Sequence, residues 1–398
     1  MKTRFAVLSV VLAAVALPAV AARTLTVKEL DALIADLQQQ SKSDAVIAQK
    51  LMEVDLSQEL TPAAIDHLRE MNLGPETLEQ IRILRVESAL LLPPASNSPN
   101  TAPPDAAAQK AILARTVSYL GDFMHLPKLS ADKTTVRYQN GPDYVYSSDG
   151  GTMTARTDLG QQFSPDNPYL KALGEHTMPV ELMGGVEIHP KKFRADDPSA
   201  RNGQISQGGP GPLLGVAFED AAKSGLEFSH WQIVDGKALA VFAFEVPKKH
   251  SHYEVNYCCF PHTESVGSHL GAPMTSSASG SMGAGAGIAT ANSMYATNTT
   301  FEPFRAKVGY HGEFFIDPAT GDVLRFIMRA EMKKSDFVQQ EDTRIDYGPV
   351  TMGAKTMLLP QESFVLTRVI PAGDSGQRIA ERRTLFDVRY SNYGEAGS

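Results

Sequence analysis

Residues 310–330 read YHGEFFIDPATGDVLRFIMRA and contain two runs of strand-forming residues on either side of a turn. The runs are FFI at 314–316 and VLRFIM at 323–328. Between them, residues 317–322 read DPATGD, and Asp, Pro and Gly favour tight turns through side-chain capping and their backbone preferences. The stretch therefore predicts an antiparallel β-hairpin.

Similar patterns extend from this hairpin in both directions. Residues 228–246 predict a second hairpin, because Asp235-Gly236 separates two runs rich in aromatic and β-branched residues. A strand is expected at 253–259. Further strands are predicted at 134–138, 144–146, 343–347, 355–359, 363–369 and 384–390. We therefore expect a large antiparallel sheet of eight or more strands.

Both faces of this sheet carry large apolar residues. The segments 242–245 and 326–329, which read FAFE and FIMR, do not alternate cleanly between apolar and polar positions. A sheet with one solvated face would do so. Two helices, predicted at 106–120 and 213–222, are available to plug the concave face. The expected fold is therefore α+β, with one large, curved antiparallel sheet whose concave face is apolar and partly open.

A small helical array precedes the sheet. Thr26 and Glu29 form a capping box ahead of apolar residues at helical spacing. Asp44 is predicted as the N-cap of a second helix, Thr61-Pro62 begins a third, and a fourth runs from Glu76. Residues 22–92 are therefore interpreted as a helical module.

Two segments have the composition of connections. Residues 93–105 read PPASNSPNTAPPD, which is typical of a stiff, extended linker. Residues 265–299 are rich in Gly, Ser and Ala with few large side chains, which predicts a mobile loop. We therefore expect the sheet domain to comprise residues 106–398, interrupted by that loop.

The N-terminal 21 residues resemble a cleavable signal peptide. Lys2 and Arg4 precede an apolar run that ends at Pro18 and small residues, with cleavage expected before Ala22 or Arg23. An uncleaved membrane anchor is the alternative. We therefore predict a periplasmic or secreted protein without a transmembrane anchor after cleavage.

The composition excludes one class of partner. With 37 basic and 45 acidic residues the net charge is −8, and no basic stripe interrupts this balance. An acidic surface repels nucleic acid, so we exclude nucleic-acid binding. No sequence motif indicates a cofactor.

A group of histidines and cysteines is the main candidate for a metal site. His250 and His252 have the spacing of side chains on one face of a strand, and Cys258, Cys259, His262 and His269 follow. Their spacing matches no standard zinc pattern, so no metal is expected. The adjacent cysteines leave a strained vicinal disulfide and unpaired thiols as alternatives. An Asp317–Asp322 calcium loop and an Asn298 glycosylation acceptor are weaker patterns.

Aromatic residues in the predicted strands have two interpretations. Most strand aromatics belong to a core. The alternative is that one sheet face lines an apolar cavity, and its candidate lining residues are then Trp231, Phe242, Phe244, Phe314 and Phe326.

The C-terminal half resembles the outer-membrane lipoprotein carriers and their relatives with the LolA/LolB/RseB-like fold. The resemblance rests on residues 310–325, on Asp346–Val350 with Leu358–Pro360, and on Arg389–Tyr393. It implies a strongly curved antiparallel sheet, an unclosed barrel, with helices that plug its concave face. Members of this group hold acyl chains or lipoprotein segments in the cavity. The helical module and the loop at 265–299 depart from the carrier pattern. The whole chain also resembles an exported bacterial family of unknown function.

Three functions remain open at this point. The first is a non-enzymatic binding protein for acyl chains or lipoproteins, and the second is an envelope module that interacts with, or senses, a protein partner. The third is a hydrolase whose site the sequence does not reveal. A lined apolar cavity favours the first function, and a convergent His and carboxylate pair in a cleft favours the third.

Overall fold

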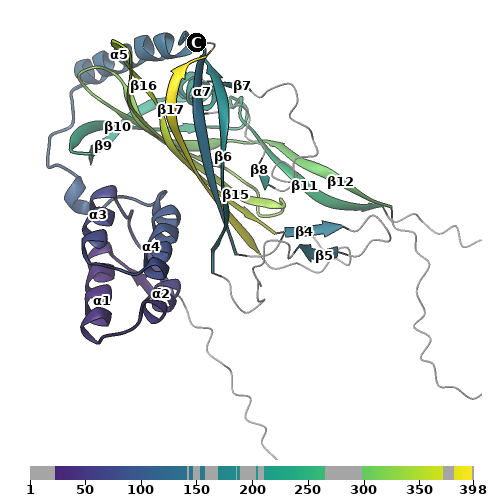
Figure 1. The fold of residues 1–398 in the computed structure, drawn as a ribbon. Helices are drawn as coiled ribbons and strands as arrows, with labels where there is room; N and C mark the ends of the chain where they lie inside the picture. Colours follow the sequence, from purple (N-terminus) through teal and green to yellow (C-terminus); the bar gives the residue numbers. More distant parts are fainter. Residues whose placement is uncertain are drawn as a thin grey trace, which may run out of the picture.

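The computed structural model describes residues 23–140, 143–146, 153–156, 169–184, 186–188, 203–204, 210–264, 298–370 and 381–396 (Figure 1). The predicted signal peptide at 1–21 and residues 265–297 of the loop predicted at 265–299 lie outside these residues, whereas residues 298 and 299 belong to a strand rather than to the loop. Among the described residues, no helix combines the length and apolar character needed to cross a membrane.

One large antiparallel sheet dominates the molecule, as predicted. It has ten strands in the order β7-β6-β3-β17-β16-β15-β14-β13-β10-β9, and its edges β7 and β9 leave it open (Figure 1). Its strands are β3 (Leu129–Gln139), β6 (Lys171–Met183), β7 (Val186–Ile188), β9 (Leu226–Val234), β10 (Lys237–Val246), β13 (Tyr310–Ile316), β14 (Val323–Ala330), β15 (Val338–Met352), β16 (Lys355–Val369) and β17 (Arg382–Glu395).

Smaller sheets surround it. Strand β11 (Glu254–Glu264) pairs with β12 (Asn298–Lys307) and β8 (Gly203–Gln204), and β4 (Asp143–Tyr146) pairs with β5 (Met153–Arg156). The short strands β1 (Arg23–Leu25) and β2 (Val54–Leu56) form a parallel pair that the sequence did not indicate.

The two predicted hairpins are confirmed. Strands β9 and β10 turn at Asp235 and Gly236, whose φ angles of 49° and 78° match the left-handed turn that Asp-Gly favours. Strands β13 and β14 form the 310–330 hairpin. Within it, a Cβ atom on Gly312 would lie 1.9 Å from the carbonyl oxygen of Ile327, so only glycine fits there.

The long strand β16 corrects one prediction. The sequence predicted separate strands at 355–359 and 363–369, on either side of Pro360. Instead one strand continues through Pro360, and the register with β15 shifts between Asp346 and Tyr347, where Pro360 lies opposite Tyr347. The irregularity absorbs the proline without ending the strand.

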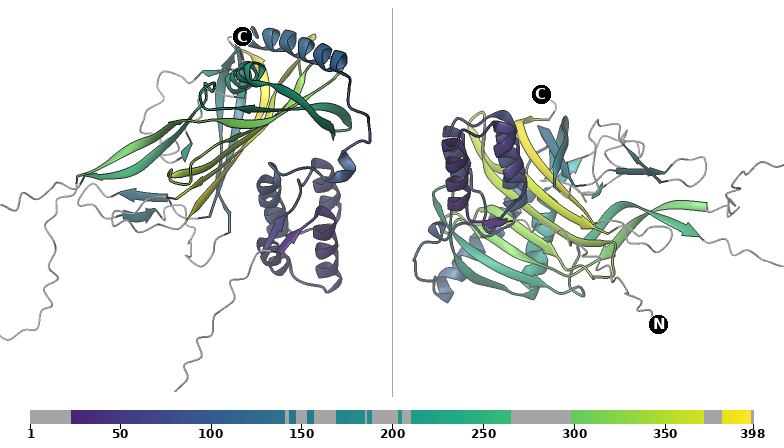
Figure 2. Two further views of the ribbon diagram at one scale, coloured as in Figure 1. Left: turned by 180° about the vertical axis from the view of Figure 1, so that it is seen from behind. Right: turned by 90° about the horizontal axis from the view of Figure 1, so that it is seen from below.

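Helices cover both faces of the sheet (Figure 2). Helices α5 (Ala106–Met124) and α7 (Pro210–Ser224) cover one face, here called the α7 face. Helix α4 (Pro75–Ser88) packs on the opposite face, here called the α4 face, against Val136, Phe364 and Leu385. Helices therefore cover both faces of the sheet, as the apolar residues on both faces predicted. The cover on the α4 face comes from the N-terminal module.

The helical module has its own small core. It comprises α1 (Val27–Gln39), α2 (Asp44–Met52), α3 (Pro62–Glu70) and α4, packed around Leu30, Ile34, Leu51 and Ile81. The Thr26–Glu29 capping box is present. Because α4 contributes Ile81 to this core and Ile83 to the contact with the sheet, one helix belongs to both.

Asp44 has a different role from the one predicted. Ser43 is the N-cap of α2, and the Asp44 carboxylate instead accepts hydrogen bonds from the backbone N–H groups of Glu76 and Thr77 at 2.9 and 3.1 Å. Gly74, the N-cap of α4, has no side chain to satisfy those donors. Asp44 therefore caps α4 from a neighbouring helix.

Candidate functional site

The aromatic residues considered as cavity lining are packed tightly on the α7 face. Phe242 pairs across the sheet with Phe314, which pairs in turn with Phe326. The ring centroids of Phe314 and Phe326 are 5.1 Å apart, and Phe244 lies 4.7 Å from Phe314. Phe218 of α7 lies edge-on to Phe314 at 5.4 Å. These four strand phenylalanines are buried and form core rather than the wall of an open cavity.

Trp231 lies at the margin of this cluster, on the edge strand β9, where Phe228 contacts both its ring and that of Phe242. Its indole Nε1 donates a hydrogen bond of 2.9 Å to the carbonyl of Ala102 in the proline-rich linker. The neighbouring Gln232 donates to the carbonyl of Asn97 at 2.6 Å. The linker, which contains the short 3₁₀ helix η1 (Ala95–Asn97), therefore lies against an open sheet edge that would otherwise invite pairing with another chain.

One member of the histidine group, His252, contacts a carboxylate. The buried Asp220 of α7 accepts from the backbone N–H of His252 at 2.8 Å and contacts its Nδ1 at 2.6 Å. Its other contact is the Tyr310 hydroxyl at 2.8 Å. Burial opposes ionisation of Asp220, but these hydrogen bonds lower its pKa overall.

This pair does not by itself make a catalytic site. Among the described side chains, no hydroxyl or thiol is hydrogen-bonded to His252, as an activated nucleophile would be. No group of three or more metal-ligating side chains occurs in the described part of the chain. The side chains of Cys258, Cys259 and His262, and all of His269, lie outside it.

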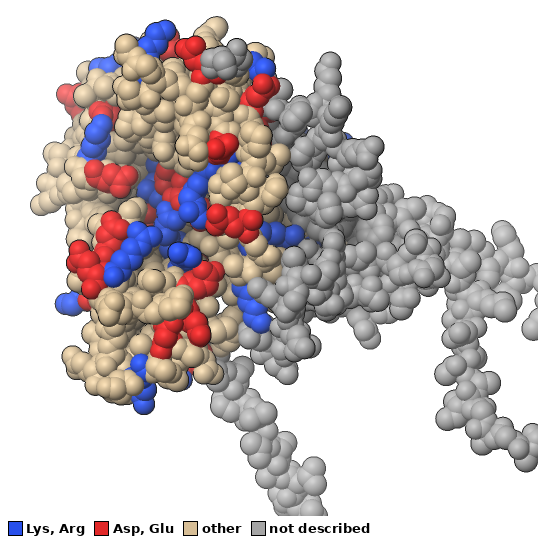
Figure 3. All heavy atoms as spheres, viewed as in Figure 1, with Lys and Arg blue, Asp and Glu red and all other residues tan. Residues whose placement is uncertain are grey.

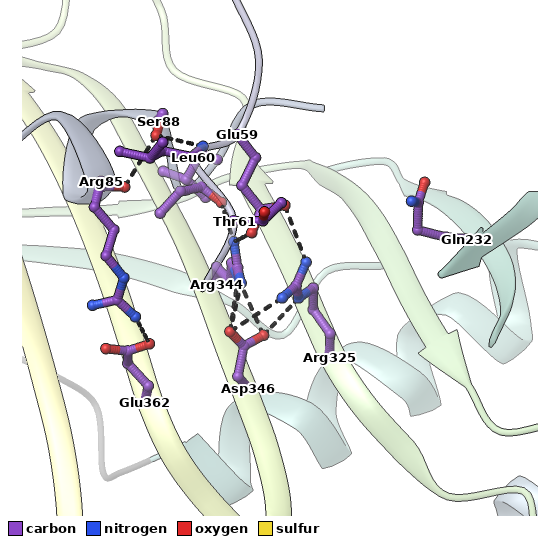
Figure 4. A network of polar contacts seen from close by, with 12 residues as sticks. Glu59, Leu60, Thr61, Arg85, Ser88, Gln232, Arg325, Arg344, Asp346 and Glu362 are labelled. Atoms are coloured by element: carbon purple, nitrogen blue, oxygen red, sulfur yellow. Dashed lines mark hydrogen bonds and ion pairs between the residues drawn. The ribbon is translucent and has the colours of Figure 1, made fainter. Parts of the chain in front are cut away.

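Two arginines and two carboxylates form an ion network between the module and the sheet (Figure 4). Arg344 of β15 contacts Glu59 at 2.7 Å and Asp346 at 2.6 Å. Arg325 of β14 contacts the same carboxylates at 3.3 and 2.6 Å. Glu59, which precedes α3, is thus bound by two strands of the sheet. Arg325, Arg344 and Glu59 are all buried.

The network is charge-balanced, and this permits its burial. Desolvation alone would raise the pKa of Asp346, but attraction by Arg325 and Arg344 lowers the pKa to about 2. A buried ion group of this kind gains little over apolar packing, whereas loss of one member leaves an uncompensated charge. The network therefore favours one docking position of the module.

The end of α4 adds backbone contacts to this docking. Arg344 donates to the carbonyl of Ala89 at 2.7 Å, and Arg329 donates to the carbonyl of Leu90 at 2.9 Å. Carbonyl groups at a helix C-terminus lack partners within the helix and carry partial negative charge. The sheet therefore supplies cations that satisfy the last turn of α4.

A cleft of about 290 Å³ lies next to the network, between the module and the α4 face of the sheet. Its positions on α3 and α4 have helical spacing, so that each helix presents one face to it. Its lining residues are Pro62, Ile65, Asp66 and Arg69 of α3, Leu78, Ile81, Arg82 and Arg85 of α4, Tyr138 of β3, Glu362 of β16, and Asp387 and Arg389 of β17.

Arginines dominate the outer part of this cleft. The side chains of Arg69, Arg82 and Arg389 are 61, 65 and 49% exposed. Figure 3 shows basic side chains gathered where the module meets the sheet, with acidic side chains beside them. Within the described part of the chain, the ion-pair partners of Arg69 and Arg82 are exposed carboxylates on their own helices. Such surface pairs are weak, so these guanidinium groups can exchange partners for a ligand anion.

Two carboxylates lie deeper in the cleft. Glu362 forms an ion pair with Arg85, and Asp387 contacts Arg389 at 3.3 Å. Burial raises the pKa of both carboxyl groups, although the neighbouring arginines oppose the shift. The Asp387 Oδ1 atom is buried and has no hydrogen-bond partner among the described residues. A buried polar atom left in this way is costly unless something binds it.

A second cleft lies on the other side of α4. It is lined partly by Leu51, Leu84, Tyr169 and Glu87. Burial raises the pKa of Glu87 to about 7, although Arg383 at 3.5 Å opposes the shift. This carboxyl group therefore titrates near neutral pH.

Sequence reasoning did not find the arginine cleft or the ion network. Their charged residues are distributed over two helices, four strands and the segment before α3. The available signals were Arg325, Arg344 and Asp346, which occupy strand positions between large apolar residues, and Ile83 and Val86, which form a second apolar stripe on α4.

In comparisons with protein-family models, curated proteins and solved structures, no match was found.

Proposed function

We propose that this protein is an exported, non-enzymatic binding protein for an amphipathic ligand with an apolar chain and an anionic group, such as a fatty acid or the acylated part of a larger molecule. The observation that carries this proposal is the cleft between the helical module and the sheet. It combines apolar walls with three exposed guanidinium groups.

The walls and the rim suit different parts of such a ligand. Leu78 offers partly exposed aliphatic surface to the cleft, and the buried Ile65 and Ile81 of the module core lie in the same walls. Apolar walls with a few convergent polar groups are typical of small-molecule sites. Arg69, Arg82 and Arg389 can form charge-assisted hydrogen bonds to a carboxylate or phosphate.

The resemblance to lipoprotein carriers supports the same class of ligand, as does the open sheet with helices across one face. The carrier resemblance would place the apolar chain of the ligand between the sheet and helices α5 and α7. The packed rings of Phe244, Phe314 and Phe326 occupy that space in this structure, so the cleft is the better candidate.

A titration with a fluorescent fatty acid tests the proposal. We expect saturable binding that weakens at least tenfold in the double variant Arg82→Glu/Arg389→Glu, because a rim of reversed charge repels the carboxylate. The control is Lys28→Glu/Lys110→Glu, which makes the same charge change at exposed positions away from the cleft.

A fatty alcohol of equal chain length should bind more weakly than the acid. Absence of saturable binding by folded protein over several chain lengths would refute the proposal and favour the envelope-interaction function.

A further inference from the structure

The floor and the rim of the cleft offer different groups to a ligand. At the floor lie two carboxyl groups, Glu362, which pairs with Arg85, and Asp387, whose Oδ2 atom contacts Arg389. At the rim, the exposed arginines provide positive charge. A purely anionic ligand would match only the rim.

One oxygen of Asp387, at the floor of the cleft, lacks a hydrogen-bond donor among the described residues. Asp387 is 2% exposed, and its Oδ1 atom has no hydrogen-bond partner in the described part of the chain. A carboxylate oxygen accepts hydrogen bonds. The missing group is therefore a hydrogen-bond donor, and a cationic donor forms the stronger, charge-assisted hydrogen bond to a carboxylate.

The positions of Asp387 and Arg389 determine how far apart the donor group and the anionic group of the ligand must lie. They are two residues apart on β17, so their side chains project from the same face of the strand, with Cα atoms about 6.6 Å apart. A ligand that satisfies both must carry its cationic donor and its anion a few bonds from each other.

We infer that the cleft binds a zwitterionic head group of the phosphoethanolamine class, with its ammonium group at Asp387 and its phosphate at the rim arginines. This assignment rests on the proposed function and adds the chemistry of the head group. Tyr138, which also lines the cleft, lies on β3, the strand that pairs with β17 on the side of Asp387. The acyl part of a phospholipid would follow the aliphatic walls.

The test compares short-chain phospholipids that are soluble as monomers and share the same acyl chains. Dihexanoyl phosphatidylethanolamine should bind about tenfold more tightly than the phosphatidylcholine or phosphatidylglycerol analogue, because one charge-assisted hydrogen bond contributes on that order. The choline head group has the charge but no N–H donor, and the glycerol head group lacks the cation. Isothermal titration calorimetry gives the three dissociation constants.

The variant Asp387→Asn should abolish this preference while the three lipids still bind. Asn has the same shape and removes the carboxylate, and the control Asp122→Asn changes an exposed carboxylate outside the cleft. The comparison of head groups on the unaltered protein stands even if a variant fails to fold.

Free O-phosphoethanolamine distinguishes the source of the head group. Tighter binding of the lipid than of the free compound assigns a phospholipid, and equal binding assigns a soluble ligand with the same chemistry. Equal binding of the three phospholipids would overturn the inference and leave the proposed function standing. No binding of any lipid or fatty acid would overturn both.

Discussion

Individual charged residues in this protein depend on burial for their properties. Glu87 and Asp346 are both carboxylic acids near α4 and the sheet. Two buried arginines lower the pKa of Asp346 to about 2, whereas burial with a single arginine nearby raises that of Glu87 to about 7. Local partners therefore decide which carboxyl group is charged at neutral pH.

The raised pKa of Glu87 predicts a specific pH dependence of stability. The ordinary pKa of a Glu side chain is 4.5, and that of Glu87 in the folded protein is about 7. Between these two pH values the folded state binds more protons than the unfolded state. The free energy of unfolding should therefore fall as pH rises through this window. Glu87→Gln should flatten the fall and stabilise the protein at pH 8 by about 1–2 kcal/mol, allowing for solvent that reaches part of the side chain.

Urea unfolding at a series of pH values measures this effect, with the exposed Glu70→Gln as the control. An unchanged profile in Glu87→Gln would contradict the assignment.

The ion network predicts a large asymmetry between buried and exposed charges. Arg344→Met should lower the free energy of unfolding by about 3–5 kcal/mol, because Glu59 and Asp346 lose a buried cation. Lys50→Met, which breaks the exposed Lys50–Glu53 pair, should change it by no more than about 1 kcal/mol. Equal losses in urea unfolding would show that the network is solvated.

Helix α4 shows how an element can depend on a distant residue. Its N-terminal donors at Glu76 and Thr77 are satisfied by Asp44, about thirty residues earlier in the chain. Asp44→Ala should therefore destabilise the protein by about 1 kcal/mol, as other cap losses do. Ser43→Ala should have little effect, since the Ser43 side chain makes no capping hydrogen bond. Thermal unfolding of both variants checks the prediction, and the reverse order would contradict it.

The same helix marks the limit of prediction from sequence. Period-two runs and turn residues such as Asp235-Gly236 identified the hairpins, because their signals are local. The Thr26–Glu29 box and the Thr61-Pro62 start were confirmed for the same reason. The role of Asp44, the second apolar stripe of α4 and the continuity of β16 through Pro360 depend on neighbours that are remote in sequence. The cleft draws Arg82 and Arg389 together from positions about 300 residues apart, so no local pattern could reveal it.

The whole molecule is a sheet covered on both faces, with the module attached through α4. Because α4 belongs to two apolar clusters, we expect module and sheet to unfold together. The single tryptophan, Trp231, lies on β9 and reports on the sheet, whereas far-ultraviolet circular dichroism includes the module's helices. The two urea transitions should coincide. A loss of helix signal at lower urea would instead show two independent units joined by the linker.

The proposed function places the ligand between the module and the sheet. Photocrosslinking with a fatty acid that carries a diazirine near its carboxylate, followed by peptide mass spectrometry, locates the bound ligand. We expect labels on peptides from α3, α4 and the Asp387–Arg389 segment of β17, all of which line the cleft. Labels concentrated on α5, α7 and the phenylalanine-bearing strands β10, β13 and β14 would contradict this expectation and place the ligand on the α7 face.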